Sequence, residues 1–271
     1  MSDRSRQPRS DFLTAYGVLI HYEIWGDSGP DVILVPGITS PAPMWGFVAE
    51  RMAAFARVFV MDVRGRGLSD RRETLSYRER DCARDVIALA RRLHRPLIVG
   101  HSMGGRIGVA AAAFAPELFS GLIAADPPVS GPGRRHYPTP LVWYLDAMEE
   151  LANGGGYEAA RRATPTWSEE LTALRAKWLP TCSREAVIGA YNSFHEDSMH
   201  ELLPRVMCPT LLLYAEHGDT IREEDAAEFV DLLPDGQAQR IDDAGHMIPY
   251  DQLTPFVDAV RAFVTEHGAT R

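Results

Sequence analysis

A serine between two glycines is the strongest chemical signal in this chain. Ser102 lies within Gly100-His101-Ser102-Met103-Gly104, directly after the apolar run 97–99 and before an Ala-rich segment. This Gly-x-Ser-x-Gly spacing between a strand and a helix is typical of a nucleophile on a sharp turn, where glycines leave room for neighbouring backbone. We therefore predict that Ser102 attacks a carbonyl carbon and that the Met103 N–H, at the helix N-terminus, binds the oxyanion.

A serine nucleophile also needs a second oxyanion donor and a base. The loop Pro36-Gly37-Ile38-Thr39 follows the first long apolar run, and we assign the second donor to the Ile38 N–H. His246 lies in 242–249, past the presumed last strand and ahead of a C-terminal helix. A neutral imidazole there would take the Ser102 hydroxyl proton and return it to the leaving group. His101, by contrast, is expected to pack or to bond a loop.

The acid that orients His246 has two candidates, because the order serine, acid, histidine leaves two acceptable positions. Asp126 ends the apolar run 122–125, whereas Asp219 follows the run 211–214, which is the commoner location. Two observations favour Asp126. Gly218 stands where the usual spacing would place the acid, and Pro127-Pro128 restricts the backbone after Asp126. Asp219 is kept as the alternative acid.

The elements that must position these residues are short apolar strands alternating with helices. Almost wholly apolar runs occupy 32–35, 58–61, 97–99, 122–125 and 211–214, and helix-like stretches occupy 80–93, 106–115 and 223–233. Such runs are typical of parallel strands covered on both faces, and the alternation predicts a doubly wound sheet. Together with the serine turn, this pattern predicts the α/β-hydrolase fold.

Two glycine-containing segments are expected to be structural. The strand-like segment 18–25 is followed by the turn 26–30, which suggests a hairpin at the sheet edge. The loop 62–69 follows the second apolar run, and its glycines permit a tight turn while Arg64 ties loops together. Direct substrate contact by the loop 62–69 is the less favoured alternative.

The alternation of strand and helix stops between residues 127 and 204. Pro, Gly, Trp and charged residues there surround helical patches at 143–152 and 169–178. We predict that 127–204 is a helical cap inserted over the carboxyl ends of the strands. Segments 1–126 and 205–271 would then form one hydrolase core, as a chain of 271 residues allows.

Composition excludes several classes of protein and partner. A formal net charge of −9 argues against nucleic acid, because phosphate binding relies on clustered Lys and Arg. The chain has no apolar run of the length that a membrane span or a signal peptide needs, so a cytoplasmic location without membrane association is expected. No cluster suggests a metal or an organic cofactor. Three cysteines are expected to be buried thiols because their number is odd and their spacing is wide: Cys82, Cys182 and Cys208.

With these residues in place, the chain resembles the N-formylmaleamate deformylases of aerobic nicotinate degradation, which are α/β-hydrolases. The most specific stretch is Asp126-Pro127-Pro128-Val129-Ser130-Gly131-Pro132-Gly133-Arg134-Arg135, and the resemblance also covers 35–41, 45–51, 62–69 and 244–249. It implies hydrolysis of an N-formyl amide to an amide and formate, through a formyl-enzyme on Ser102. It also implies that Asp126 is the acid.

A substrate of that family carries a carboxylate, so the resemblance implies a small anionic amide as partner and a cation near the pocket. Arg134 and Arg135 are the candidates, since they follow the strand that bears Asp126, and His136 and Trp143 are possible neighbours. Two other functions remain open at this point. One is a carboxylesterase or C–C bond hydrolase on the same scaffold, and the other is a non-enzymatic ligand receptor. The sequence does not indicate an oligomeric state.

Overall fold

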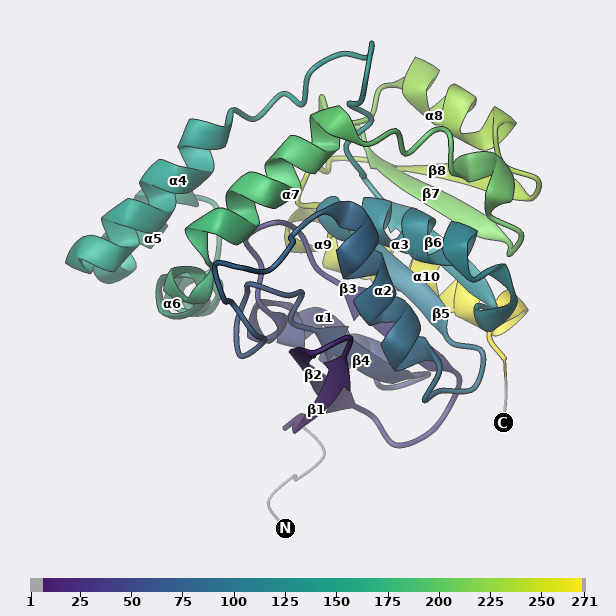
Figure 1. Cartoon of the computed structure of the whole chain (residues 1–271), viewed down its shortest axis with the longest axis horizontal. Helices are drawn as coiled ribbons and strands as arrows, with labels where there is room; N and C mark the ends of the chain where they lie inside the picture. The colour runs from purple at the N-terminus through teal and green to yellow at the C-terminus, as the bar shows by residue number, and fades with distance from the viewer. Residues whose placement is uncertain (1–6, 270–271) are drawn as a thin grey trace.

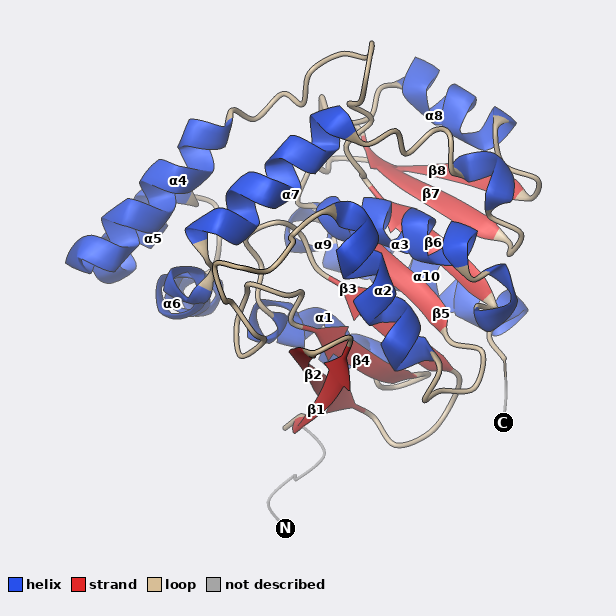
Figure 2. Ribbon diagram, viewed as in Figure 1, coloured by secondary structure: helices blue, strands red, loops and turns tan. Residues whose placement is uncertain are grey.

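An eight-stranded sheet forms the centre of the molecule (Figures 1 and 2). The structure is a computed structural model that describes residues 7–269, so most of the polar segment that opens the chain lies outside it. The strand order is β1-β2-β4-β3-β5-β6-β7-β8, and every neighbouring pair from β4 to β8 is parallel. The strands are β1 (Arg9–Ala15), β2 (Val18–Trp25), β3 (Asp31–Val35), β4 (Arg57–Met61), β5 (Leu97–His101), β6 (Gly121–Ala125), β7 (Thr210–Ala215) and β8 (Gly236–Ile241).

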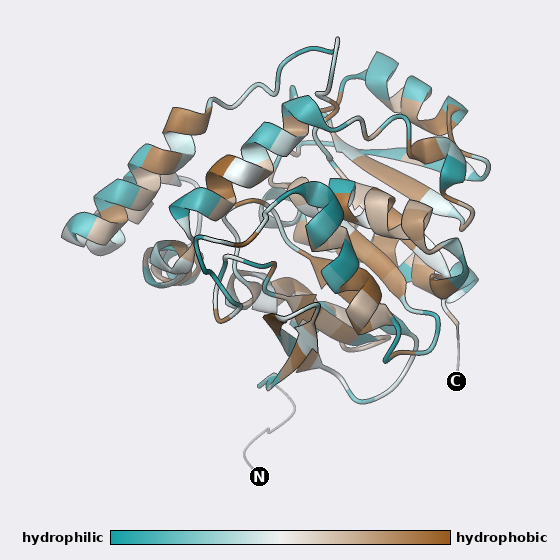
Figure 3. Ribbon diagram, viewed as in Figure 1, coloured by the Kyte–Doolittle hydropathy of each residue, from teal (hydrophilic) through white to brown (hydrophobic). Residues whose placement is uncertain are grey.

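The central strands form because their residues are apolar on both faces. β3, β5 and β6 are buried at every position, as expected for parallel strands between two helical layers. Figure 3 shows the same strands as a hydrophobic band inside more hydrophilic helices and loops. All five apolar runs of the sequence are strands, and the predicted doubly wound sheet is confirmed.

The edge hairpin differs from the sequence-based expectation. β2 pairs antiparallel with β1 across the tight turn at Tyr16 and Gly17, both of which have positive φ. The segment 26–30 does not close a hairpin. It leads to β3, which lies on the far side of β4 and pairs with β4 and β5. The polar residues of β1 concealed it in the sequence, because an edge strand keeps one face in water.

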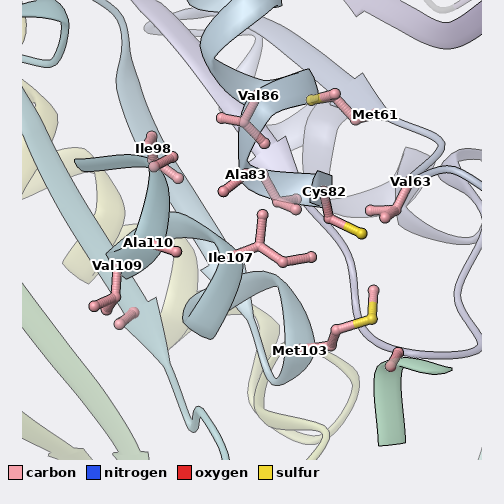
Figure 4. Close-up of a cluster of buried hydrophobic side chains, with 14 of the residues drawn as sticks. Met61, Val63, Cys82, Ala83, Val86, Ile98, Met103, Ile107, Val109 and Ala110 are labelled. Atoms are coloured by element: carbon pink, nitrogen blue, oxygen red, sulfur yellow. The ribbon is translucent and has the colours of Figure 1, made fainter. Parts of the chain in front are cut away.

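Helices cover both faces of the sheet. α2 (Glu79–Ala90), α3 (Met103–Phe114) and α8 (Glu223–Asp231) contribute to one buried apolar cluster, and α1 (Gly46–Met52) and α10 (Leu253–His267) contribute to the other. Figure 4 shows part of the first cluster, where Ile107 and Met103 of α3 lie beside Cys82 and Val86 of α2. All three cysteines are buried and free, as predicted.

Four helices are inserted between β6 and β7. They are α4 (Leu141–Glu150), α5 (Gly156–Ala163), α6 (Glu169–Trp178) and α7 (Arg184–Glu196). In Figure 1, α4, α5 and α6 project to the left of the sheet, and α7 lies beside α4. The helical patches expected at 143–152 and 169–178 correspond to α4 and α6. Within residues 7–269, no helix is long and apolar enough to cross a membrane.

Candidate active site

Ser102 sits on a strained turn between β5 and α3. Its backbone has φ 53° and ψ −120°, a conformation that is costly for a residue with a side chain. The flanking glycines are required because a side chain would not fit at either position. A Cβ atom at Gly100 would lie 2.2 Å from the Gly104 carbonyl oxygen, and one at Gly104 would lie 1.8 Å from the Val35 carbonyl oxygen. The glycines therefore let strand and helix pack closely enough to hold the serine in this conformation.

The structure brings Ser102, His246 and Asp126 together although they are far apart in the sequence. The His246 Nε2 lies 3.0 Å from the Ser102 Oγ, and the His246 Nδ1 lies 2.6 Å from the Asp126 Oδ2. Asp126 is fully buried, whereas the His246 side chain is about a quarter exposed. This is the geometry in which a carboxylate fixes the imidazole tautomer and leaves Nε2 to accept the serine proton.

The alternative acid Asp219 lies away from the imidazole. It is mostly exposed and forms an ion pair with Arg222 at 2.7 Å. That pair lowers the pKa of the Asp219 carboxyl, as expected for a solvated loop carboxylate beside a cation. Gly218, where the sequence suggested a missing acid, approaches Asp126 instead: its added Cβ would lie 3.4 Å from the Asp126 Oδ2.

Three further side chains hold His246, and of these contacts the sequence indicated only that His101 would pack or bond a loop. The Thr220 Oγ1 lies 3.1 Å from Nδ1, and the Tyr137 hydroxyl lies 3.3 Å from Nε2 and 3.1 Å from the Tyr144 hydroxyl. The His101 Nε2 lies 2.8 Å from the His246 carbonyl oxygen. Burial, with a smaller contribution from His246, lowers the pKa of His101 to about 3, so His101 stays neutral and donates to that carbonyl.

The two predicted oxyanion donors lie at the same end of the sheet. Ile38 belongs to the loop after β3, and Met103 is the first residue of α3. Within the described residues, neither backbone N–H makes a hydrogen bond. The Met103 N–H is among those that a helix leaves unpaired at its N-terminus. Both donors are therefore available to an oxygen that becomes negative beside Ser102.

A cavity of about 450 Å³ opens over Ser102. Ser102, His246 and Ile38 line its floor from the core, while Trp143 and Arg175 line it from the inserted helices. Its remaining lining is mostly small, apolar or aromatic: Gly37, Thr39, Ser40, His101, Pro138, Thr139, Pro140, Tyr144, Ala163, Thr164, Pro165, Thr166, Trp167 and Met247. This size suits a small molecule.

Three of the four predicted substrate contacts lie outside this cavity. Arg134 pairs with Glu228, and Arg135 pairs with Asp225 at 2.5 Å while also donating to backbone carbonyls. His136 packs against His195, with ring centroids 5.2 Å apart. In this structure the two arginines do not line the cavity, because carboxylates of α8 bind both guanidinium groups. Of the four, only Trp143 lines the cavity.

Arg175 of α6 is the cation that the cavity contains. It is 5% exposed, and within residues 7–269 its guanidinium makes no ion pair or hydrogen bond. It lies instead near two indoles, with Cζ 5.7 Å from the Trp167 ring centroid and 6.0 Å from that of Trp143. Burial lowers the pKa of Arg175, but a guanidinium remains charged at neutral pH. Nothing in the sequence around Arg175 indicated that its side chain would point into the cavity.

One group of side chains could in principle hold a metal ion. Within the described residues, the ligand atoms of Glu216, His217 and Asp243 lie within 4.8 Å of one another. All three residues are exposed, and the cavity over Ser102 is lined by other residues. Exposed carboxylates of this kind are common without an ion, so the group carries no functional argument.

Comparison with known proteins agrees with this geometry. Residues 32–259 match the model of the Alpha/beta hydrolase family. The chain is 45% identical to the N-formylmaleamate deformylase of Pseudomonas putida over 254 residues, which cover 93% of this chain and 95% of the relative. A crystal structure of an N-formylmaleamic acid deformylase from Pseudomonas putida S16 superimposes with a TM-score of 0.91 at 42% identity, covering 93% of this chain and all of that one.

A more distant solved structure shares the fold. The E-2-(acetamidomethylene)succinate hydrolase superimposes with a TM-score of 0.78 at 23% identity, covering 96% of this chain and all of that one. The fold predicted from the serine turn and the alternating strands is thus shared with solved hydrolases. The chain belongs to the alpha/beta hydrolase family.

Proposed function

We propose that this protein hydrolyses the N-formyl amide of N-formylmaleamate, giving maleamate and formate. The observation that carries the proposal is a single cavity that joins the Ser102–His246 pair to the unpaired guanidinium of Arg175. The first group is suited to acyl transfer and the second to a carboxylate. The extensive identity to N-formylmaleamate deformylase supports the same substrate.

In the first half of the reaction, the Ser102 Oγ attacks the formyl carbon while the His246 Nε2 takes its proton. The negative charge that forms on the formyl oxygen is bound by the Met103 and Ile38 N–H groups. Asp126 stabilises the imidazolium through Nδ1. The C–N bond then breaks, and the imidazolium returns the proton to the leaving nitrogen. Maleamate departs, and the formyl group remains as an ester on Ser102.

In the second half, water attacks the formyl ester. The His246 Nε2 takes a proton from this water, and the resulting oxyanion again lies at the Met103 and Ile38 N–H groups. The Ser102 Oγ leaves with the proton from the imidazolium, and formic acid is released and ionises. The proposed reaction thus consumes one water and regenerates the enzyme with its residues alone.

Arg175 supports an anionic substrate because buried charges normally have partners. A charged group taken out of water is costly unless it is paired and hydrogen-bonded. Arg175 is charged and nine-tenths buried, and its Nε has no partner within residues 7–269. A substrate carboxylate would supply the missing charge and acceptors. We assign to the segment 127–204 the role of a cap, since it contributes Arg175 and Trp143 to the cavity.

The proposal is tested by measuring formate release from N-formylmaleamate and hydrolysis of p-nitrophenyl acetate, a neutral ester. Arg175→Gln should raise KM for N-formylmaleamate by roughly tenfold to a hundredfold, because a hydrogen bond to a charged group contributes about 1.5–3 kcal/mol. Ester hydrolysis should change little. Arg134→Gln is the matched control, since its guanidinium pairs outside the cavity. If the wild-type enzyme hydrolyses p-nitrophenyl acetate but releases no formate from N-formylmaleamate, the proposed substrate is refuted.

A further inference from the structure

A second arginine is buried without a carboxylate partner, directly beneath the oxyanion donors. Arg66 belongs to the loop after β4 and is fully buried. Within the described residues it forms no ion pair, and all its hydrogen bonds go to uncharged acceptors. These are the carbonyl oxygens of Ile38 at 3.0 Å, Arg64 at 2.8 Å and Ala186 at 3.1 Å, and the Met103 Sδ at 3.6 Å.

Two other arginines in this part of the core have carboxylate partners. Arg64, two residues earlier in the same loop, forms a bidentate ion pair with Asp85. Arg106 of α3 pairs with Glu79 at 2.5 Å. Arg66 therefore differs from these two because no carboxylate offsets its positive charge, although it donates to three carbonyl oxygens. Arg175 also lacks a carboxylate partner, but unlike Arg66 it has an Nε without a hydrogen-bond partner within residues 7–269.

The contacts of Arg66 join the two residues that carry the oxyanion donors. Its Nε donates to the Ile38 carbonyl, which fixes the orientation of the loop after β3. Its Nη2 contacts the side chain of Met103, the residue that begins α3. The same nitrogen donates to Ala186 in α7, which connects this arrangement to the inserted helices. One guanidinium thus contacts the loop after β3, the first residue of α3 and the inserted helix α7.

We propose that Arg66 is the positioning residue of the oxyanion hole, and that its uncompensated charge stabilises the tetrahedral intermediates. The inference rests on the proposed roles of Ile38 and Met103. Fixed positive charge in a water-excluded site stabilises developing negative charge without reorganisation. Arg66 touches neither Ser102 nor the cavity in the described residues, so it acts through the two donors and through its field.

The test separates charge from hydrogen bonding with two substitutions. Arg66→Lys keeps the charge and loses the planar fork, whereas Arg66→Gln keeps an amide donor and loses the charge. Arg66→Gln should lower kcat by about ten- to a hundredfold with little change in KM, less than the about 10²–10³ typical of losing an oxyanion donor. Arg66→Lys should retain a kcat within about tenfold of wild type, since charge is the larger contribution.

A second measurement reports on the tetrahedral state directly. A small alkylboronic acid, which forms a tetrahedral anion on an active serine, should bind Arg66→Gln more weakly by the same factor as kcat falls. A purely structural role would instead change KM and give equal losses in both variants. Equal or greater kcat in Arg66→Gln than in Arg66→Lys would overturn the inference. If Arg66→Gln does not fold, the inference would be overturned by a hundredfold fall of kcat in Arg66→Lys.

The measurements use p-nitrophenyl acetate as well as N-formylmaleamate. Ester hydrolysis needs the oxyanion hole but not the formyl amide or a carboxylate. A wild-type enzyme that hydrolyses only the ester would therefore refute the proposed substrate and still allow the Arg66 comparison. Wild-type kcat in Arg66→Gln on both substrates would refute the role of Arg66 and leave the proposed reaction standing.

Discussion

Residues 7–269 contain two Ser–His–Asp arrangements, and their hydrogen-bond distances are similar. In the first, the His246 imidazole lies 3.0 Å from the Ser102 Oγ and 2.6 Å from the Asp126 carboxylate. In the second, at the edge of the sheet, the His21 imidazole lies 2.6 Å from the Ser10 Oγ and 2.7 Å from the Asp62 carboxylate. By distance alone, the second arrangement is as good as the first.

The two arrangements differ in their surroundings. Ser102 is strained at φ 53°, begins a helix and lines a cavity beside free N–H donors. Ser10 lies in the regular ladder of β1 opposite Glu23, without positive φ, a following helix or a place in that cavity. A serine hydroxyl bonded to an imidazole can give up its proton, but attack also needs a site for substrate and oxyanion.

The second arrangement has a structural explanation. The buried Asp62 carboxylate accepts hydrogen bonds from the Ala42 N–H at 2.6 Å and the Leu68 N–H at 2.9 Å besides the one from His21. It therefore ties together three segments that are distant in the sequence. Gly67 permits this approach, since an added Cβ would lie 2.2 Å from the carboxylate. The surroundings, and not the three side chains, therefore distinguish a serine nucleophile from a serine that only stabilises the fold.

The largest expected effect is on the nucleophile itself. Ser102→Ala should lower kcat on the order of 10⁶-fold, as loss of the serine does in serine proteases. Formate release under single-turnover conditions measures it. A sulfonyl fluoride should modify Ser102 and leave Ser10 unmodified, as measured by peptide mass spectrometry. Labelling of Ser10 at a comparable rate would break the distinction between the two arrangements.

The next effect concerns the acid. Asp126→Asn should lower kcat by about 10⁴-fold, because an asparagine favours the wrong imidazole tautomer. Asp219→Asn should leave kcat close to wild type, since Asp219 pairs with Arg222 at the surface. Both variants are compared on N-formylmaleamate and p-nitrophenyl acetate. A greater loss in Asp219→Asn would show that the acid is Asp219.

A smaller effect is expected for the tyrosine beside the imidazole. Burial raises the pKa of Tyr137, so its hydroxyl stays protonated, and it lies 3.3 Å from the His246 Nε2. Tyr137→Phe should lower kcat about tenfold, the equivalent of one hydrogen bond. Tyr144→Phe is the matched control, because its hydroxyl contacts Tyr137 and not the imidazole. Equal losses in the two variants would show that the contact with Nε2 is unimportant.

The smallest effect on activity is expected at the sheet edge. Ser10→Ala should leave kcat and KM within about twofold of wild type, while lowering the free energy of unfolding by about 1 kcal/mol for one lost hydrogen bond. Steady-state assays and urea unfolding measure the two quantities. A tenfold fall in kcat without loss of stability would contradict a structural role for the Ser10–His21–Asp62 arrangement.

Much of the core could be predicted from the sequence because its signals are local. The apolar runs, the Gly-x-Ser-x-Gly turn and the position of His246 each depend on a few consecutive residues, and the structure places all of them as expected. The preference for Asp126 over Asp219 also began with a local feature, the glycine at 218. The exception was β1, which is mostly exposed and carries polar residues, whereas β8, also mostly exposed, was presumed ahead of His246 without bounds.

The functions of the arginines could not be predicted in the same way. Arg134 and Arg135 follow the strand that bears Asp126, yet carboxylates of α8 bind both. Arg175 and Arg66 have no local pattern that marks them, because their burial without a carboxylate depends on α6 packing against the cavity and on the loop after β4 reaching Ile38. The order of residues along the chain does not show which arginine side chains will form ion pairs in the folded protein.

Local sequence signals were enough to predict the turn that holds Ser102, the strands beside it and the order serine, acid, histidine along the chain. Backbone sterics of glycine and serine act between neighbours, and apolar runs are buried wherever the chain folds. Only the folded chain shows which Ser–His–Asp arrangement lines a cavity and which arginine has no carboxylate partner. Both depend on contacts between segments more than 40 residues apart, such as those of His21 with Asp62 and of His246 with Asp126.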